Sequence, residues 1–450
     1  MGSDWEVVKL RNAAQFFSGG TPPKSKPEYW GGDIPWISAK SMKGSRYHDS
    51  DLKLTEAGLK KGSRLASKNS ILLLVRGSML HQKIPVGIAT KDVAFNQDVK
   101  AIVPNEKFLP LYFYYCFAGR EHELLAKVEN TGIGAGKLDT DVLNKVEFYC
   151  PPIQEQKVIA NFLGSLDDKI ELNRQMNETL EAMAQALFKS WFVDFDPVID
   201  NALAAGNAIP DEFIERAEQR KAIEKKDNAD IQSLFPDEFE FTEEMGWIPK
   251  GWGVKSLDEV ADYLNGLALQ KYRPEDIDDN YLPIVKIAQL REGLPNHDEK
   301  ASINIKPEYI IDNGDVIFSW SGSLLVDVWC GGKAALNQHL FKVTSDKYPK
   351  WFYLNYTKHH LVEFQRIATD KAVTMGHIKR GHLKEALCVI PENGVDDNIF
   401  AVFEGILNKQ IRLRIESQTL AKLRDTLLPK LMSGELRIPD AAELVGEAII

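Results

Sequence analysis

Residues 153–191 read IQEQKVIANFLGSLDDKIELNRQMNETLEAMAQALFKSW, and this stretch decides the architecture of the chain. It contains no proline and one glycine, and its apolar residues recur at alternating spacings of four and three. Such spacing places them on one face of a helix and is typical of a coiled-coil seam. Asn173 and Asn177 fall in the same heptad frame, where they either lie on a solvent-exposed side of the helix or fix the register of the helix against a partner.

A second helix with the same kind of stripe is predicted near the end of the sequence, because Ile399, Ile406, Leu413, Leu420 and Leu427 lie seven residues apart. The simplest partner for each apolar stripe is the other. We expect the two helices to form a spacer, about 60 Å long at about 1.5 Å per residue if unbroken. The predicted core of this spacer consists of Leu166, Ile170, Leu180, Leu187, Ile406, Leu413, Leu420 and Leu427.

The sequence around these helices is duplicated. Gly19 pairs with Gly266, Asn96-Gln97 with Asn337-Gln338, and Gly136 with Gly376, in one order and at a slowly drifting offset. Each copy mixes strand-like runs, at 71–75 and 316–320, with short aromatic helices at 110–127 and 349–366. We therefore expect an α+β fold, in which two mixed α/β domains are each followed by a long helix.

The predicted boundaries follow from this repeat and from the charge distribution. The net charge is −10, yet residues 151–245 carry 9 basic against 21 acidic residues, while residues 1–150 carry 21 against 16. The charged run 212–230 is either a solvated face or a docking surface for a basic partner. We predict a first domain at 1–150, a helix at 151–196, an acidic connector at 197–246, a second domain at 247–391, a helix at 392–435 and a tail at 436–450.

Composition excludes several classes of protein. The longest aliphatic run, at 71–75, is far shorter than the roughly 20 residues that a membrane span needs. The first residues do not form an export leader or a myristoylation motif, so we expect a cytoplasmic protein without membrane association. The four cysteines, Cys116, Cys150, Cys330 and Cys388, include no C-x-x-C pair, and we expect neither a zinc site nor disulfides.

Sequence motifs for catalysis are also missing. Gly136-Lys137 is not a phosphate-binding loop, because Thr131 stands where the first glycine should be and Leu138 where a Ser or Thr should be. The pair His359-His360 lies on adjacent positions that do not face one metal ion. The tetrapeptide (N/D)-P-P-(Y/F), with which amino-methyltransferases hold a flipped base, does not occur. We expect no catalytic residue, no metal site and no cofactor bound by this chain.

Basic, amide, hydroxyl and aromatic side chains gather in corresponding loops of the two copies. Lys and Arg suit phosphates and guanine edges, and Gln, Ser and Thr suit other base edges, although each residue could equally be an ordinary solvated side chain. The DNA-binding candidates of the first copy are Lys24, Lys26, Tyr29, Lys40, Lys43, Arg46, Tyr47, Arg76, Ser78, Gln82 and Lys83. Those of the second copy are Lys271, Tyr272, Arg273, Lys286, Arg291, Trp320, Ser321, Thr374, His377, Lys379 and Arg380.

Three groups of motifs occur in a fixed order along the chain. They are SGGTP at 18–22 with PEYWGGDIPWI at 27–37, then PPIQEQ at 151–156 with IANFL at 159–163, then FKSWFVDFDP at 188–197. Together they resemble the specificity (S) subunit of type I restriction–modification systems, over nearly the whole chain. The second copy departs from the pattern, with NGLA at 265–268 and PENG at 391–394, as expected if it reads a different half-site.

The resemblance implies a DNA sequence-recognition subunit that is not itself an enzyme. Each recognition domain would read one half of a bipartite, asymmetric target in double-stranded DNA. The two helices, packed antiparallel, would set the gap between the halves and dock two methylation subunits, and restriction subunits would join the full complex. S-adenosylmethionine would bind to the methylation subunits. The alternatives are a fused DNA methyltransferase polypeptide and a two-headed scaffold that does not bind DNA.

Overall fold

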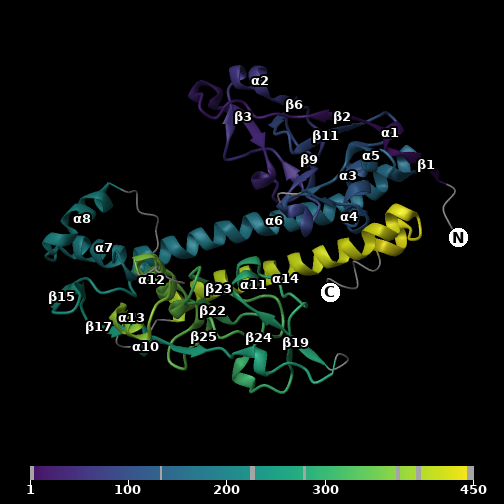
Figure 1. The fold of residues 1–450 in the computed structure, drawn as a ribbon. Helices are drawn as coiled ribbons and strands as arrows, with labels where there is room; N and C mark the ends of the chain where they lie inside the picture. The colour runs from purple at the N-terminus through teal and green to yellow at the C-terminus, as the bar shows by residue number, and fades with distance from the viewer. Residues whose placement is uncertain are drawn as a thin grey trace. The chain divides into compact units, whose positions relative to one another are not determined.

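A computed structural model describes residues 5–131, 134–222, 229–276, 280–370, 376–391 and 397–442 (Figure 1). The chain divides into two compact units, Met1–Glu171 with Ser417–Ile450 and Leu172–Glu416. We call them unit 1 and unit 2. Each unit contains one duplicated domain together with parts of both long helices, so the units cut across the boundaries predicted from the sequence. The reason is that each half of a helix belongs to the core in which its apolar residues are buried.

Unit 1 is built on two mixed sheets and two smaller ones. The strand order of the larger sheets is β2-β11-β7-β9-β4 and β5-β3-β10-β6. The strands of the first are β2 (Ala14–Ser18), β11 (Val99–Pro104), β7 (Ile71–Leu74), β9 (Val86–Ala89) and β4 (Arg46–Tyr47). Those of the second are β5 (Lys53–Leu54), β3 (Trp30–Ile37), β10 (Val93–Phe95) and β6 (Arg64–Ala66). The smaller sheets pair β1 (Glu6–Lys9) with β14 (Glu147–Cys150), and β13 (Gly136–Lys137) with both β12 (Glu129–Asn130) and β8 (Arg76–Gly77).

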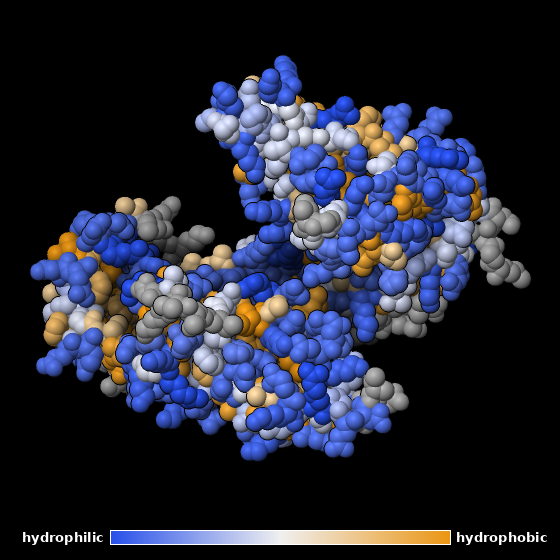
Figure 2. Space-filling model, in the orientation of Figure 1, coloured by the Kyte–Doolittle hydropathy of each residue, from blue (hydrophilic) through white to orange (hydrophobic). Residues whose placement is uncertain are grey.

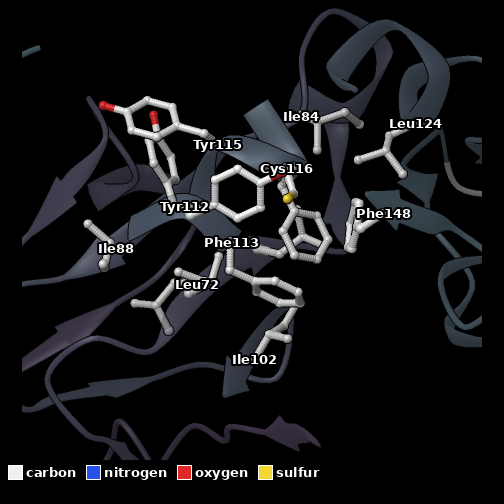
Figure 3. Packing of buried hydrophobic residues seen from close by; sticks show 14 of the residues in the cluster. Leu72, Ile84, Ile88, Ile102, Tyr112, Phe113, Tyr115, Cys116, Leu124 and Phe148 are labelled. Carbon is white, nitrogen blue, oxygen red and sulfur yellow. The ribbon is translucent and has the colours of Figure 1, made fainter. Parts of the chain in front are cut away.

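The helices of unit 1 are short apart from the long pair. They are α1 (Leu10–Ala13), α2 (Glu56–Gly62), α3 (Pro110–Ala118), α4 (Glu121–Leu125) and α5 (Thr140–Leu143). Strand β7 is buried along its whole length, which explains its continuous aliphatic sequence. Figure 3 shows the α3 ring of Phe113 beside Ile102 of β11, and its centroid lies 5.4 Å from that of Phe148. Residues Leu427, Leu428 and Leu431 join this core, so the last turns of the second helix belong to unit 1.

Unit 2 repeats the sheet pattern of unit 1. Its strand orders are β18-β25-β22-β23 and β20-β19-β24-β21. The strands of the first sheet are β18 (Asp262–Asn265), β25 (Leu340–Thr344), β22 (Val316–Ser319) and β23 (Leu325–Val328). Those of the second are β20 (Lys300–Ser302), β19 (Tyr281–Val285), β24 (Ala334–Leu336) and β21 (Ile310–Ile311). In addition, β17 (Trp252–Ser256) pairs with β26 (Leu387–Pro391). The helices are α10 (Leu257–Val260), α11 (Ile287–Glu292), α12 (Lys350–Asp370) and α13 (Arg380–Glu385). The α+β class and the two mixed domains predicted from the sequence are thus confirmed.

The two long helices are α6 (Ile153–Phe192) and α14 (Asp397–Ser433), drawn in teal and yellow in Figure 1. In unit 1, Arg424 donates to Asp167 at 2.6 Å, and Arg437 beyond the end of α14 pairs with Glu155. In unit 2, Asn173 donates to Glu416 and Gln410 donates to Glu181, both at 3.1 Å. Within each unit the residue number rises along α6 as it falls along α14, so the segments run antiparallel.

The predicted seam is right for some residues and shifted for others. Leu166, Leu413, Leu420 and Leu427 are buried, whereas Ile170, Leu180, Leu187 and Ile406 are only half-buried. Phe188, which follows Leu187 in the chain, and Leu407, which follows Ile406, are buried instead. Ile399 and Leu413, one heptad before and after Ile406, are both buried, so the departure at 406 is local and is not a drift of the helix against the seven-residue repeat.

The asparagines of α6 differ from each other. Asn173 is 1% exposed and donates to Glu416, so its side chain is buried and does not lie on a solvent-exposed side of the helix. Asn177 is half-buried and donates to the backbone oxygen of Asn173 at 3.1 Å, while its own Oδ1 is buried without a hydrogen-bond partner. The middle of the helix is therefore polar where a leucine would be expected, and only Asn173 fits the interpretation as a register residue.

The predicted acidic connector is a folded segment. It contains α7 (Asp196–Ala205), α8 (Ile214–Lys221), α9 (Ala229–Gln232) and an antiparallel hairpin of β15 (Phe239–Thr242) and β16 (Gly246–Pro249). The pairing of residues 239–242 with 246–249 in this hairpin was not predicted from the sequence. The two strands are short, and the acidic residues in and between them obscure the alternation of apolar and polar side chains that is typical of a strand. None of the described helices is long and apolar enough to cross a membrane.

Candidate nucleic-acid interface

Four segments of unit 1, distant in sequence, meet beyond the ends of β2 and β7. The backbone amide of Gly20 donates to Phe95 O at 2.9 Å, and that of Val75 donates to Asp98 O at 2.8 Å. The amide of Leu138 in turn donates to Val75 O at 2.9 Å. These bonds bring together residues 18–21, 75–77, 95–98 and 136–138, which together with Lys100 beside Ser18 we call site 1.

Glycine is required where these segments touch. A Cβ atom on Gly19 would lie 2.2 Å from the Phe95 carbonyl oxygen, and one on Gly136 would lie 2.8 Å from the Leu80 Cβ. Neither distance is compatible with a side chain. The backbone segments can therefore close on one another only because these positions lack Cβ, as expected for close backbone approach.

Site 1 carries cationic, amide and hydroxyl groups. Lys100 Nζ donates to Ser18 Oγ at 2.6 Å, and Thr21 Oγ1 donates to Gln97 Oε1 at 2.6 Å. Arg76 and Lys137 face each other across β8 and β13. A hydrogen bond to Asp139 raises the pKa of Lys137, so this ammonium group stays charged at neutral pH. Because Lys137 is paired with Asp139 at 2.6 Å, Lys100 and Arg76 are the cations of site 1 best placed, beside the Gln97 amide, for a phosphate or the acceptor edge of a base.

Unit 2 contains the same meeting of segments, which we call site 2. The amide of Leu267 donates to Leu336 O at 3.0 Å, as that of Gly20 does to Phe95 O. Leu267 also forms an isolated bridge with Asn337, and the amide of Ile378 donates to Trp320 O at 3.1 Å. A Cβ atom on Gly266 would lie 2.3 Å from Asn337 O, almost the same clash as at Gly19. The scaffold of site 1 is thus reproduced at the equivalent residues.

The side chains of site 2 are chemically different. Trp320 Nε1 donates to Asn265 Oδ1 at 2.9 Å, and Ser321 Oγ lies 3.0 Å from His339 Nδ1. The Trp320 ring centroid lies 6.3 Å from that of His377. Arg380 lies over the ring of Phe341 at 5.7 Å and donates to Tyr263 O. Imidazole and aromatic groups thus stand in site 2 where lysine and arginine dominate site 1.

The structure separates the first-copy candidates into three groups. Arg76 belongs to site 1, and the exposed Ser78, Gln82 and Lys83 follow it directly in the chain. Lys24, Lys26, Lys40 and Lys43 are exposed on other loops, and Tyr29 is half-buried. The prediction for Tyr47 is wrong, because its side chain is buried, its hydroxyl bonds to Gly44 O at 3.2 Å, and burial raises its pKa. Arg46 is paired with Asp168 of α6, which already neutralises its charge.

The second-copy candidates divide in the same way. Trp320, His377 and Arg380 belong to site 2, and the exposed Lys379 lies between the last two. The prediction that Ser321 contacts DNA is wrong, because its side chain is buried with its hydroxyl 3.0 Å from His339 Nδ1. Lys286 pairs with Glu299, whereas Lys271, Tyr272, Arg273 and Arg291 are exposed elsewhere in the domain. Thr374 lies outside the described residues.

Several residues of the two sites were not predicted. They are Ser18, Thr21, Gln97, Lys100 and Lys137 in site 1 and Asn265, Gln338 and His339 in site 2. The sequence did contain a signal, because the repeat pairs Gly19 with Gly266, Asn96-Gln97 with Asn337-Gln338, and Gly136 with Gly376. All three pairs lie at the two sites. Among the described residues, no His, Cys, Asp and Glu side chains are grouped so as to bind a metal ion.

Comparison with known proteins identifies the family. The model of the type I restriction modification DNA specificity domain matches residues 2–182 and again residues 249–423. The chain belongs to this family of specificity subunits. The MjaIX specificity subunit of Methanocaldococcus jannaschii is 27% identical and the alignment covers 97% of this chain and 94% of the relative. The HindI specificity subunit of Haemophilus influenzae is 24% identical, with 78% and 81% covered.

A solved structure shares the fold. The type I S subunit from M. genitalium superposes with a TM-score of 0.50 at 13% sequence identity, and covers 95% of this chain and 96% of its own. The two matches to the specificity domain correspond to the two duplicated domains of this specificity subunit. Its role is DNA recognition without catalysis, as the resemblance implied. Family membership favours this role over a fused methyltransferase and over a scaffold without DNA.

Proposed function

We propose that this specificity subunit reads one bipartite, asymmetric sequence in double-stranded DNA, with site 1 and site 2 each reading one half. One observation carries the proposal: the two sites share a backbone scaffold, down to the clash positions Gly19 and Gly266, but differ in their side chains. A common scaffold supports the same mode of docking, while different side chains support different base sequences.

The chemistry of each site supports a division of labour. In site 1, Lys100 and Arg76 serve phosphates or guanine edges, and Gln97 presents an amide. Because Thr21 donates to Gln97 Oε1, the free Nε2 group acts as a donor to a base acceptor. In site 2, His377 and Gln338 read base edges, while His339 is held between Ser321 and Gln338.

The helices α6 and α14 set the unread gap and dock two methylation subunits. Leu172, Met176 and Met183 of α6 support this docking, because they are exposed and their spacing of four and seven places them on one helix face. Unbranched methionine side chains adapt readily to a partner surface. The methylation subunits supply S-adenosylmethionine binding and adenine methylation, and restriction subunits join that core in the full complex.

The test is a map of methylated adenines in a host without other adenine methylation that expresses the methylation subunits of the same system. With this chain present, methylation is expected at one gapped, asymmetric motif, and without the chain it is expected to vanish. A continuous motif, or the same methylation with and without the chain, would contradict the proposal.

A further inference from the structure

The hairpin of β15 and β16 presents aromatic side chains to solvent. Phe241 pairs with Trp247 across the hairpin and Phe239 pairs with Pro249, so all four lie on one face. Phe239 packs on Phe213 at a centroid distance of 5.0 Å, whereas the outer pair extends beyond that support. Phe241 is 64% exposed and Trp247 is 36% exposed, and Met245 in the turn is exposed as well. Contiguous exposed apolar surface that is bordered by polar residues marks interaction sites.

This face is held on a rigid base. Arg216 donates to both carboxylate oxygens of Asp196, at 2.7 and 2.8 Å, and Arg220 pairs with Asp200. These pairs clamp α8 onto α7, where both aspartates are buried. The ring of Phe195 in turn packs on Phe213 at 6.1 Å, directly below the hairpin. The aromatic pair is therefore presented by packed elements rather than by a loop.

Acidic side chains border the aromatic pair. Glu243 and Glu244 lie in the hairpin turn, and the Glu212 carboxylate lies 3.6 Å from the Cβ position of Gly246. All three are exposed, and no ion pair of these residues is seen in the described part of the chain. At the left of Figure 2, over β15 and the neighbouring helices, hydrophobic residues lie among hydrophilic ones. We call Phe241, Met245, Trp247, Glu212, Glu243 and Glu244 the acidic aromatic patch.

We propose that the acidic aromatic patch docks a basic, arginine-bearing surface of another protein subunit of the complex. Carboxylates repel DNA but pair with guanidinium groups, which also stack on the faces of Trp and Phe rings. The surrounding segment, with its 9 basic and 21 acidic residues at 151–245, attracts such a surface over a longer range. The inference rests on the proposed function only in that it requires a complex with other subunits.

The first test places the photo-crosslinking residue p-benzoylphenylalanine at position 241 of the full chain, in purified complex with methylation and restriction subunits. Val362 of α12 is the matched control position, because it is 75% exposed and apolar in the same unit. We expect Phe241→p-benzoylphenylalanine to crosslink, several-fold more than the control, to an Arg- or Lys-bearing segment of one other subunit. Crosslinks confined to this chain, to a second copy of it or to DNA, or no more than at Val362, would overturn the proposal.

The second test measures the affinity of the crosslinked subunit. Glu243→Lys with Glu244→Lys, and separately Phe241→Ser with Trp247→Ser, are each expected to weaken it about 10-fold, equal to about 1.4 kcal/mol. Glu308→Lys, at an exposed position of unit 2, is the charge control and leaves the affinity unchanged. Unchanged affinity in both double variants would overturn the proposal. Binding of target DNA by the wild-type complex is measured separately, and its loss would count against the proposed function instead.

Discussion

At the scale of single residues, the two recognition sites depend on glycines whose hydrogen faces a carbonyl oxygen. Gly19 and Gly266 lie at the same point of the repeat, and a Cβ atom on them would clash with the backbone of residues 95–96 and 336–337, respectively. Neither residue has a positive φ, so it is close approach rather than backbone conformation that requires glycine here. The side chains around these two glycines are not constrained in this way, and they differ between site 1 and site 2.

Gly19→Ala is expected to lower the free energy of unfolding of unit 1 by about 1–3 kcal/mol, because a backbone segment must shift to admit the methyl group. Target binding should weaken with it. Gly405→Ala in α14 is the control, since nothing lies within 4 Å of its Cβ position, and it should be neutral or stabilising by up to about 1 kcal/mol. Denaturant unfolding followed by circular dichroism measures both. Equal effects of the two substitutions would show that Gly19 is not under steric pressure.

Lys100→Met should reduce the salt dependence of DNA binding, with the slope of log K against log salt falling by about 1 if the lysine neutralises one phosphate. Lys68→Met is the control, because Lys68 precedes β7 and so lies at the end of that strand opposite site 1. Fluorescence anisotropy at a series of salt concentrations measures the slope of the assembled complex. A slope that changes for Lys68→Met but not for Lys100→Met would place the phosphate contacts elsewhere.

At the scale of elements, sequence patterns predicted what depends on local periodicity. The repeats of three, four and seven residues predicted α6 and α14, and the aliphatic run at 71–75 predicted β7. Elements whose sequence is dominated by charge were missed, such as the β15–β16 hairpin. The composition of sites 1 and 2 was predicted only in part, because Gln97 and Lys100 reach Thr21 and Ser18 through long-range strand pairing that no local pattern encodes.

The contact of α14 with α6 in unit 1 centres on Asp167. Its carboxylate accepts from Arg424 at 2.6 Å and from the Tyr115 hydroxyl at 2.7 Å. Burial alone would lower the pKa of Arg424, but the Asp167 charge raises it. Arg424→Met is therefore expected to destabilise unit 1 by about 3–5 kcal/mol, because it leaves a buried carboxylate without its cation.

The control for Arg424→Met is Lys127→Met, which removes an exposed i,i+4 pair with Glu123. Pairs of that kind contribute little, so unfolding should be almost unchanged. Thermal unfolding of the two variants distinguishes buried from exposed pairing. Similar melting temperatures for both would mean that the Asp167 cluster does not hold α14 in unit 1.

The clamp between α7 and α8 should weaken in acid. Burial opposes ionisation of Asp196, but hydrogen bonds from Arg216 and Ser190 hold its pKa below the usual value. A lowered pKa in the folded state means that the stabilisation is fully present above the ordinary value of about 3.9 and is lost as pH falls through the folded value. Hydrogen exchange of α8, corrected for intrinsic rates, should accelerate only below about pH 4. In Arg216→Gln it should already be fast at pH 6, and exchange that is independent of pH in the wild type would contradict the assignment.

At the scale of the whole molecule, the duplication explains how one chain serves a two-part target. The repeat was visible in the sequence and predicted two similar domains, whereas the family rests on the motifs and on the two matches to the specificity domain. Each unit contributes a site of the same backbone design, at residues 18–21, 75–77, 95–98 and 136–138 in one and at the equivalent positions in the other. Under the proposed function, the different side chains of the two sites give the two halves of the target different sequences.

The most direct test of this division is a map of methylated adenines with variants of one site at a time, in the host that expresses the methylation subunits. Gln97→Ala alters site 1 and Gln338→Ala, at the equivalent position, alters site 2. We predict that each variant relaxes the sequence preference in one half of the gapped motif and leaves the other half and the gap length unchanged. If either variant altered both halves, or if both variants altered the same half, the assignment of one half-site to each unit would be wrong.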